Sequence, residues 1–238
     1  MSGNNIMLNL QNIVVMGASG GIGHAFVDIL SQQYPNANLY SFSRTEGYKI
    51  DYAREDSIAE AANMAANTGP IDLVVVTNGM LHNQNIMPEK SLKELSREKF
   101  QQIFEVNTIV PSLIAKHFLP QLNRDKPSIF AALSARVGSI SDNELGGWYA
   151  YRAAKAALNM IIKNAAIETG RRNKNAIIVG LHPGTVDTDL SRPFHKNVPT
   201  GHILTPNQSV EKLLGVLEAL TPNESGKCFA WDGKEILP

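Results

Sequence analysis

The chain lacks the features that stabilise small secreted proteins or draw a protein to charged polymers. Its 238 residues include a single cysteine, Cys228, which excludes an internal disulfide. Lys plus Arg and Asp plus Glu number 22 each, so the formal net charge is zero. A surface without excess charge does not concentrate phosphate backbones or anionic lipid. We therefore expect neither nucleic acid nor a membrane as a partner.

Long hydrophobic runs and metal-binding spacings are also missing. The first five residues hold no basic segment followed by an apolar run, and apolar stretches elsewhere have the length of a strand rather than of a bilayer. A cytoplasmic location is expected. The six histidines lack the paired spacing of metal ligands, and no metal site is predicted.

Short apolar runs alternate along the chain with helical patterns. Strands are predicted at residues 12–16, 39–43, 71–77, 128–133, 176–181 and 227–230, and helices at 21–33, 56–66, 149–169 and 206–220, with another ending near Leu122. Unbroken apolar strands are typical of a parallel sheet covered on both faces. No repeat, linker or charge block divides the chain. We predict one α/β domain over residues 1–238, a Rossmann-type doubly wound parallel sheet of about seven strands with helices on both faces.

A glycine-rich turn, Gly17-x-x-x-Gly21-x-Gly23, joins the first predicted strand to the first predicted helix. Missing side chains let backbone amides approach a phosphate at the positive end of a helix. The alternative is a tight connection without a ligand. Because strand and helix flank the turn correctly, dinucleotide binding is favoured.

The second predicted strand ends in Ser43-Arg44. A protein that selects unphosphorylated ribose places an acidic residue here, whereas a guanidinium suits a 2′-phosphate. NADP(H) is therefore preferred and NAD(H) remains possible, although a surface arginine after a strand is common.

Tyr151 and Lys155 lie four residues apart in a predicted helix and share one face. A tyrosine ordinarily loses its proton near pH ~10, so acid–base work at neutral pH needs a nearby positive charge. Lys155 is placed to supply that charge, and Tyr151 is placed to protonate a carbonyl oxygen or deprotonate an alcohol. Taken alone, the spacing also fits an unrelated pair on an amphipathic helix.

In order and spacing, these motifs resemble the short-chain dehydrogenase/reductase family. The matching positions are Gly17, Gly21, Ile22, Gly23, Asp51, Asn107, Tyr151, Lys155, Pro183, Gly184 and Thr188. The stretches around Ser134 and Tyr151 resemble the C-factor-like signalling branch and related small carbonyl reductases.

The resemblance implies roles for individual residues. Asp51 and Tyr52 would contact the adenine, Asn107 would hold a water in a proton relay through Lys155, and Pro183 to Thr188 would bind the nicotinamide half. The cofactor-binding residues it implies are Gly17, Ser19, Gly20, Gly21, Ile22, Gly23, Ser43, Arg44, Asp51, Tyr52, Asn78, Gly79, Asn107, Tyr151, Lys155, Pro183, Gly184, Val186 and Thr188. The catalytic residues are Tyr151, Lys155 and Asn107, with Ser134 as the candidate hydroxyl donor.

The chain departs from the family pattern at two places. Ala135 occupies the position of the carbonyl-polarising serine, and Val76-Thr77 stands where asparagine is common. Ser134 or Ser139 could replace the missing hydroxyl, but successive strand side chains face opposite ways, so Ser134 should point away unless the strand has ended. Losing one donor to a developing oxyanion costs about 10²-fold in rate.

Two functions from different classes follow. The first is an NADP(H)-dependent oxidoreductase that interconverts a small carbonyl compound and its alcohol. The second is a dinucleotide-binding signalling or sensor protein with weak catalysis, which Ala135 favours. We also expect a homodimer or homotetramer formed through the long helix, and a lid at residues 191–205.

Overall fold

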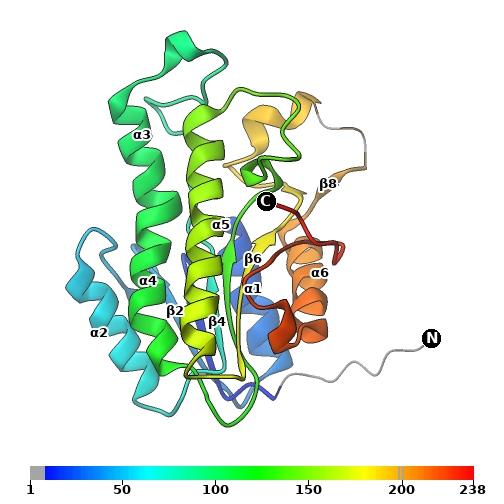
Figure 1. Ribbon diagram of the computed structural model, residues 1–238. Helices are drawn as coiled ribbons and strands as arrows, with labels where there is room; N and C mark the ends of the chain where they lie inside the picture. Colours follow the sequence, from blue (N-terminus) through cyan, green and yellow to red (C-terminus); the bar gives the residue numbers. More distant parts are fainter. Residues whose placement is uncertain (1–8, 198, 200) are drawn as a thin grey trace.

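The computed structural model describes residues 9–197, 199 and 201–238 (Figure 1). Its main sheet has seven strands in the order β3-β2-β1-β4-β5-β6-β9, every neighbouring pair parallel. The bounds are β1 (Asn12–Met16), β2 (Asn38–Ser43), β3 (Tyr48–Lys49), β4 (Leu73–Val76), β5 (Ser128–Leu133), β6 (Ala176–His182) and β9 (Cys228–Ala230). The strand order reverses between β1 and β4, as in a doubly wound sheet. The predicted fold class is confirmed.

Helices cover both faces of the sheet because both faces are apolar (Figure 1). On one face lie α1 (Gly21–Gln33) and α6 (Pro206–Ala219), and on the other α2 (Glu55–Ala66), α4 (Val110–Phe118) and α5 (Tyr149–Gly170). Alternation along β5 divides its side chains between the two layers. Ile129 and Leu133 join the α1 and α6 layer, whereas Phe130 joins the layer of α4 and α5.

Several short elements were not predicted. The helix expected to end near Leu122 consists of α3 (Arg97–Phe104), a π-helical turn (Glu105–Ile109) and α4, followed by a 3-10 turn. Two-residue strands β7 (Thr185–Val186) and β8 (Ile203–Leu204) pair with each other outside the main sheet. The predicted lid contains a 3-10 helix, η5 (Arg192–Asn197), while its residues 198 and 200 lie outside the described residues.

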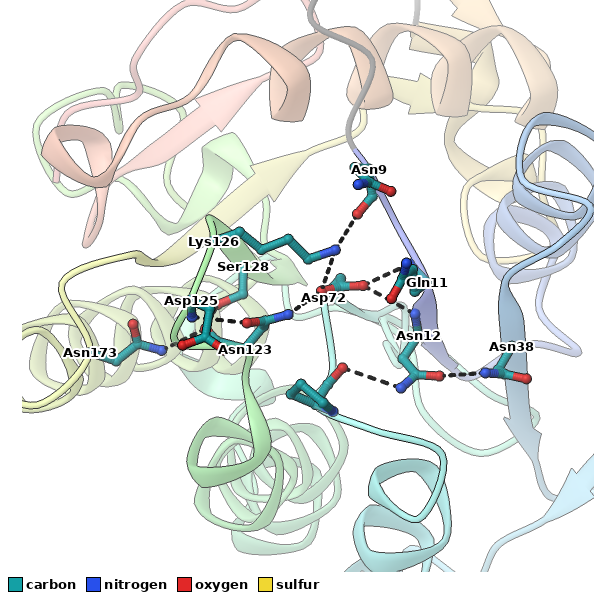
Figure 2. A network of polar contacts seen from close by, with 11 residues as sticks. Asn9, Gln11, Asn12, Asn38, Asp72, Asn123, Asp125, Lys126, Ser128 and Asn173 are labelled. Carbon is teal, nitrogen blue, oxygen red and sulfur yellow. Dashed lines mark hydrogen bonds and ion pairs between the residues drawn. The ribbon is translucent and has the colours of Figure 1, made fainter.

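A buried carboxylate ties the amino ends of the central strands together (Figure 2). Asp72 is 1% exposed and accepts hydrogen bonds from the backbone amides of Gln11 at 2.7 Å and Asn12 at 3.2 Å. It also accepts from Asn123 Nδ2 at 2.9 Å and pairs with Lys126 Nζ at 3.1 Å. Since a buried charge is stable only when it is paired, this network fixes β1, β4 and the segment before β5 relative to one another.

The opposite edge of the sheet is formed by the carboxyl ends of its strands. Parallel strands bring their carboxyl ends to one edge, so the segments after β1, β2, β4, β5 and β6 meet there. Among the described residues, no helix has the length and apolar character needed to cross a bilayer. The same part of the chain contains no group of three or more His, Cys, Asp or Glu residues suited to a metal ion.

Candidate active site

The glycine-rich turn follows β1 and packs closely against Thr77, the residue after β4. Gly17 has φ +81°, and a Cβ there would lie 2.8 Å from Thr77 Oγ1, so a side chain is excluded by both conformation and space. Its amide donates to Tyr52 Oη at 2.9 Å. Thr77 donates to Met16 O at 2.8 Å. Thr77 thus binds β4 to β1 at a position where the family commonly has asparagine.

The amino end of α1 is open to an anion. Gly20 is its N-cap residue and offers no side-chain cap, and the first turn has no acidic residue. Ser19, Gly20 and Gly21 are exposed. A Cβ on Gly23 would collide with Gly17 O, so the turn and helix approach as closely as glycine permits. Uncapped amides at the positive end of a helix fit a phosphate group.

Two residues predicted to bind the cofactor, Ser43 and Arg44, have different surroundings at the end of β2. Ser43 is buried, and its hydroxyl donates to Glu46 O at 2.6 Å and accepts from Glu46 N at 2.7 Å. Its hydroxyl therefore closes the turn into β3. Arg44 is exposed and can meet an anion. Asp51 is also exposed and accepts from Ala53 N at 3.0 Å.

Asn78 carries an unsatisfied polar atom at this edge. Within the described part of the chain, its Oδ1 is buried without a hydrogen-bond partner. Burial raises the pKa of the neighbouring Tyr52, while Asn78, the Gly17 backbone and the Arg44 charge act to lower that pKa. The Tyr52 hydroxyl accepts from Gly17 N at 2.9 Å and donates to Phe42 O at 3.3 Å, so it joins the glycine-rich turn to the end of β2. A buried acceptor awaiting a donor fits a bound nucleotide better than a protein-only core.

The segment after β6 packs against the glycine-rich turn. Gly184 has φ +80°, and Ser209 Oγ donates to Pro183 O at 2.7 Å, which fixes the segment to α6. A Cβ on Gly21 would meet Thr188 Cγ2 at 2.9 Å. The structure thus brings Pro183, Gly184, Val186 and Thr188 to the same edge as the glycine turn, although they are more than 150 residues apart in sequence.

Tyr151 and Lys155 stand together in the first turns of α5. They are 9% and 2% exposed, and Lys155 Nζ lies 5.7 Å from the centre of the Tyr151 ring. Lys155 donates to Leu133 O at 2.8 Å, which fixes it to the end of β5. The structure therefore brings the two predicted catalytic groups together.

Burial governs both protonation equilibria. It raises the pKa of Tyr151 above its ordinary value, and it lowers the pKa of Lys155 to about 8 against a smaller raising effect of Cys228. We expected Lys155 to lower the pKa of the phenol, but here desolvation prevails and the pKa moves upward. At neutral pH the phenol is therefore protonated.

Neither candidate serine donates to Tyr151. Ser134 Oγ donates to Asn159 Oδ1 at 2.6 Å, on the α5 side of the sheet. Ser139 Oγ lies 3.3 Å from Ser141 Oγ and accepts from Asp142 N. β5 ends at Leu133, so the strand alternation from which we expected Ser134 to point away does not reach this residue. Its hydroxyl bonds to Asn159 of α5, the helix that also carries Tyr151. Ala135 instead packs in the apolar cluster that contains Tyr151.

Asn107 occupies the π-helical turn and is fully buried. Its Nδ2 donates to Met80 O at 2.7 Å and to Ile103 O at 2.8 Å, while its Oδ1 accepts from Met80 N at 3.2 Å. The side chain is thus used to hold Met80, next to Gly79. A relay water at Asn107 would have to bind its main-chain carbonyl.

Aromatic rings from separate segments gather beside Tyr151. The Trp148 ring lies 6.3 Å from the Tyr151 ring and 4.9 Å from the Phe194 ring, both edge-on. His82 holds Phe194's segment, since its Nε2 lies 3.1 Å from Asp189 O and 3.2 Å from Leu190 O. The other apolar members of this cluster are Met80, Leu81, Phe100, Ile103, Phe104, Ala135, Val137, Ala150, Ala154 and Leu190. The surroundings of the phenol are therefore mostly apolar.

The sequence did not indicate that His82 or Phe194 belongs to the site. It predicted only that residues 191–205, which include Phe194, form a lid. His82 was noted solely as a histidine without metal spacing, and no local pattern marks a contact 107 residues away. Trp148 was left undecided between a substrate contact and simple packing, and its position against both Tyr151 and Phe194 is compatible with both.

Known proteins match this chain over most of its length. The family model for short chain dehydrogenase matches residues 11–199. The C-signal protein of Myxococcus xanthus is 31% identical over 169 residues, which cover 71% of this chain and 93% of the relative. A 1-hydroxy-2-glutathionyl-2-methyl-3-butene dehydrogenase of a Rhodococcus species is 27% identical over 234 residues, which cover 94% of this chain and 98% of the relative.

Solved structures agree on the fold. The carbonyl reductase Sniffer of D. melanogaster has a TM-score of 0.82 at 21% identity and covers 96% of this chain and 100% of its own. An NADPH-bound carbonyl reductase from chicken fatty liver has a TM-score of 0.77 at 23% identity, and the match covers 97% of this chain and 95% of the reductase. Fold, motif order and the family model agree, and the chain belongs to the short chain dehydrogenase family of oxidoreductases.

Proposed function

We propose that the protein uses NADPH to reduce a small carbonyl compound to its alcohol, and catalyses the reverse oxidation with NADP⁺. The observation that carries this proposal is the pairing of a buried, protonated Tyr151 with Lys155 at the edge where the glycine turn opens. The phenol is protonated at neutral pH, which is the form needed to donate a proton to a carbonyl oxygen during reduction.

The residues at the carboxyl edge fit a dinucleotide. The open amino end of α1 would hold the pyrophosphate, and the unpartnered Asn78 Oδ1 would accept from the nucleoside part. Arg44 would bind a 2′-phosphate, which distinguishes NADP(H) from NAD(H). The chicken carbonyl reductase of similar fold is described as NADPH bound, which supports the same preference.

The proposed chemistry divides between cofactor and protein. A bound reduced nicotinamide supplies the hydride that reaches the carbonyl carbon. Tyr151 donates its proton to the carbonyl oxygen at the same time, so the product is a neutral alcohol. Lys155 stabilises the resulting phenolate by its charge, and a water on the main-chain carbonyl of Asn107 would pass the replacement proton. The apolar cluster around Tyr151 excludes other water and strengthens these charge interactions.

A second function keeps specific support. Ala135 lacks the hydroxyl that would polarise the carbonyl, and the hydroxyls of Ser134 and Ser139 are hydrogen-bonded to Asn159 and Ser141. A protein that binds the dinucleotide and acts by interaction with a partner, with slow turnover, agrees with that loss, and one relative is named C-signal.

The predicted homodimer or homotetramer stays a prediction, which sedimentation of the purified protein tests.

The test of the proposed function is a panel of aldehydes and ketones assayed with NADPH and with NADH. We expect turnover with NADPH to exceed turnover with NADH, and Tyr151→Phe to lower kcat by at least about 10²-fold because the proton donor is removed. Tyr149→Phe is the matched control, since it removes a phenol two residues away in the same helix. Unchanged turnover in Tyr151→Phe contradicts the assignment, and NADPH binding without turnover on any carbonyl favours the second function.

A further inference from the structure

The segment that leads into α5 has an unusual backbone. Gly146, Gly147 and Trp148 take φ values of +63°, +65° and +50° in succession. Among the described residues, Trp148 is the only non-glycine residue with positive φ. A bulky side chain in this region costs on the order of 1–2 kcal/mol, so surrounding contacts must hold it there.

Glu89 supplies those contacts from a segment about 60 residues earlier. Its main-chain oxygen accepts from Trp148 N at 2.5 Å, and its Oε2 accepts from Ala150 N at 3.3 Å. Glu89 is 2% exposed. Neither the N-cap residue Trp148 nor the first turn of α5 offers a side-chain cap or an acidic group. Glu89 therefore acts as the cap of this helix, with a carboxylate at its positive end.

Arg152 holds the same segment from the helix side. Its Nε donates to Gly146 O at 3.2 Å and to Gly147 O at 3.1 Å, and its Nη1 donates to Val137 O at 3.3 Å. Arg152 follows Tyr151 directly in sequence. The left-handed segment is thus bound on one side by Glu89 and on the other by the helix that carries the reactive phenol.

We propose that the Glu89 side chain is a positioning group for the reaction: by capping α5 at Ala150 N it sets the place of Tyr151, and it keeps the Glu89 main-chain oxygen in place against Trp148 N. Tyr151 lies one residue beyond the amide that Glu89 Oε2 accepts from. The Trp148 ring contacts Tyr151 and Phe194, so its backbone conformation also determines the apolar wall beside the phenol. The turnover part of this inference rests on the proposed function.

The test compares Glu89→Gln, Glu89→Asp and Glu89→Ala. Glutamine keeps the reach and an oxygen acceptor, aspartate keeps the charge but is one methylene too short, and alanine keeps neither. We expect kcat within about 3-fold of wild type for glutamine, about 10-fold lower for aspartate and about 10²-fold lower for alanine, because small displacements of a catalytic group cost rate steeply. The affinity for NADPH should change by less than about 2-fold in all three, since Glu89 is not among the proposed cofactor ligands.

Glu94→Ala is the matched control. Glu94 Oε2 accepts from Lys90 N at 3.1 Å in the same segment and makes no hydrogen bond to α5, so kcat should stay within about 2-fold of wild type. An equal loss in this control, or an aspartate variant more active than the glutamine variant, overturns the proposal. Should alanine prevent folding, the order of the glutamine and aspartate variants decides.

A second readout does not depend on turnover. Trp148 and Trp231 are the two tryptophans, so a Trp231→Phe background leaves the emission of Trp148 alone. Without the side-chain cap the main chain of Glu89 is no longer fixed against Trp148 N, so this emission should shift to longer wavelength in Glu89→Ala and Glu89→Asp, and not in Glu89→Gln or Glu94→Ala. Unchanged emission in Glu89→Ala overturns the proposal. If the wild type shows no turnover but the emission shifts as expected, the proposed function fails while the cap assigned to Glu89 stands.

Discussion

Restoring a hydroxyl at residue 135 tests how completely the site has kept its chemistry. Ala135 lies directly after Ser134 in extended backbone, with φ −154° and ψ 147°, a conformation that serine adopts without strain. It packs in the cluster that contains Tyr151, whereas the Ser134 hydroxyl is held by Asn159. Ala135→Ser therefore places a new donor on the side of the phenol without disturbing the neighbouring contact.

The expected gain follows from the value of one donor to a developing oxyanion. Such a hydrogen bond is worth about 10²-fold in kcat, or about 3 kcal/mol of transition-state stabilisation. A hydroxyl beside apolar neighbours costs about 1–3 kcal/mol when it finds no partner, which sets a loss of stability that the site must tolerate. We expect a rise in kcat approaching 10²-fold with substrate bound, and little change in NADPH affinity.

Steady-state oxidation of NADPH with the best carbonyl of the panel measures this effect. Ala135→Cys is the matched control, because a thiol adds similar volume but is a weak donor, and its kcat should stay near that of wild type. A rise of less than about 3-fold in Ala135→Ser, or an equal rise in the cysteine variant, refutes the reasoning. A small rise in Ala135→Ser would mean that wild-type turnover already uses another donor, and an equal rise in Ala135→Cys would mean that added volume rather than a hydroxyl causes the gain.

Three further predictions concern stability and cofactor choice. Asp72→Ala should lower the free energy of unfolding by about 3–5 kcal/mol in urea titrations, since it leaves Lys126 and two backbone amides without their buried partner, and a loss under 1 kcal/mol contradicts this. Arg44→Ala should raise the Kd for NADPH about 10-fold or more but that for NADH less than 2-fold, and equal losses exclude a role in 2′-phosphate binding. The pKa of Lys155, lowered to about 8 by burial, lies below its unfolded value, so the unfolded chain binds more protons between pH 8 and pH 10. The difference in the free energy of unfolding between the wild type and Lys155→Met should therefore shift in favour of the wild type by up to about 1.4 kcal/mol per pH unit as the pH rises through this window. A difference that does not change with pH contradicts this prediction.

The sheet was predictable where strands are buried on both faces. The runs at β1, β4, β5 and β6 are continuous and apolar, so their type followed from composition alone. β3 was missed because Tyr48 and Lys49 are exposed and only two residues pair. The π-helical turn at Glu105–Ile109 was missed because it interrupts an otherwise helical pattern without any proline or glycine.

The site was predictable where a role depends on local spacing. The proximity of Tyr151 and Lys155 follows from helix geometry. The direction of Ser134 did not follow from strand alternation, because β5 ends at Leu133. The upward shift in the pKa of Tyr151 was not foreseen, because desolvation depends on the tertiary surroundings. Glu89 was not singled out at all, since no sequence pattern links a residue to a helix that begins 60 positions later.

Transfer of deuterium from NADPH that carries deuterium at both hydrogens of the nicotinamide C4 tests the central claim most directly. Mass spectrometry of the alcohol formed by the wild type should find one deuterium on the carbinol carbon, and Tyr151→Phe should form this product at least about 10²-fold more slowly. An alcohol without deuterium, or labelled product formed equally fast by the variant, would contradict hydride transfer assisted by the Tyr151 phenol.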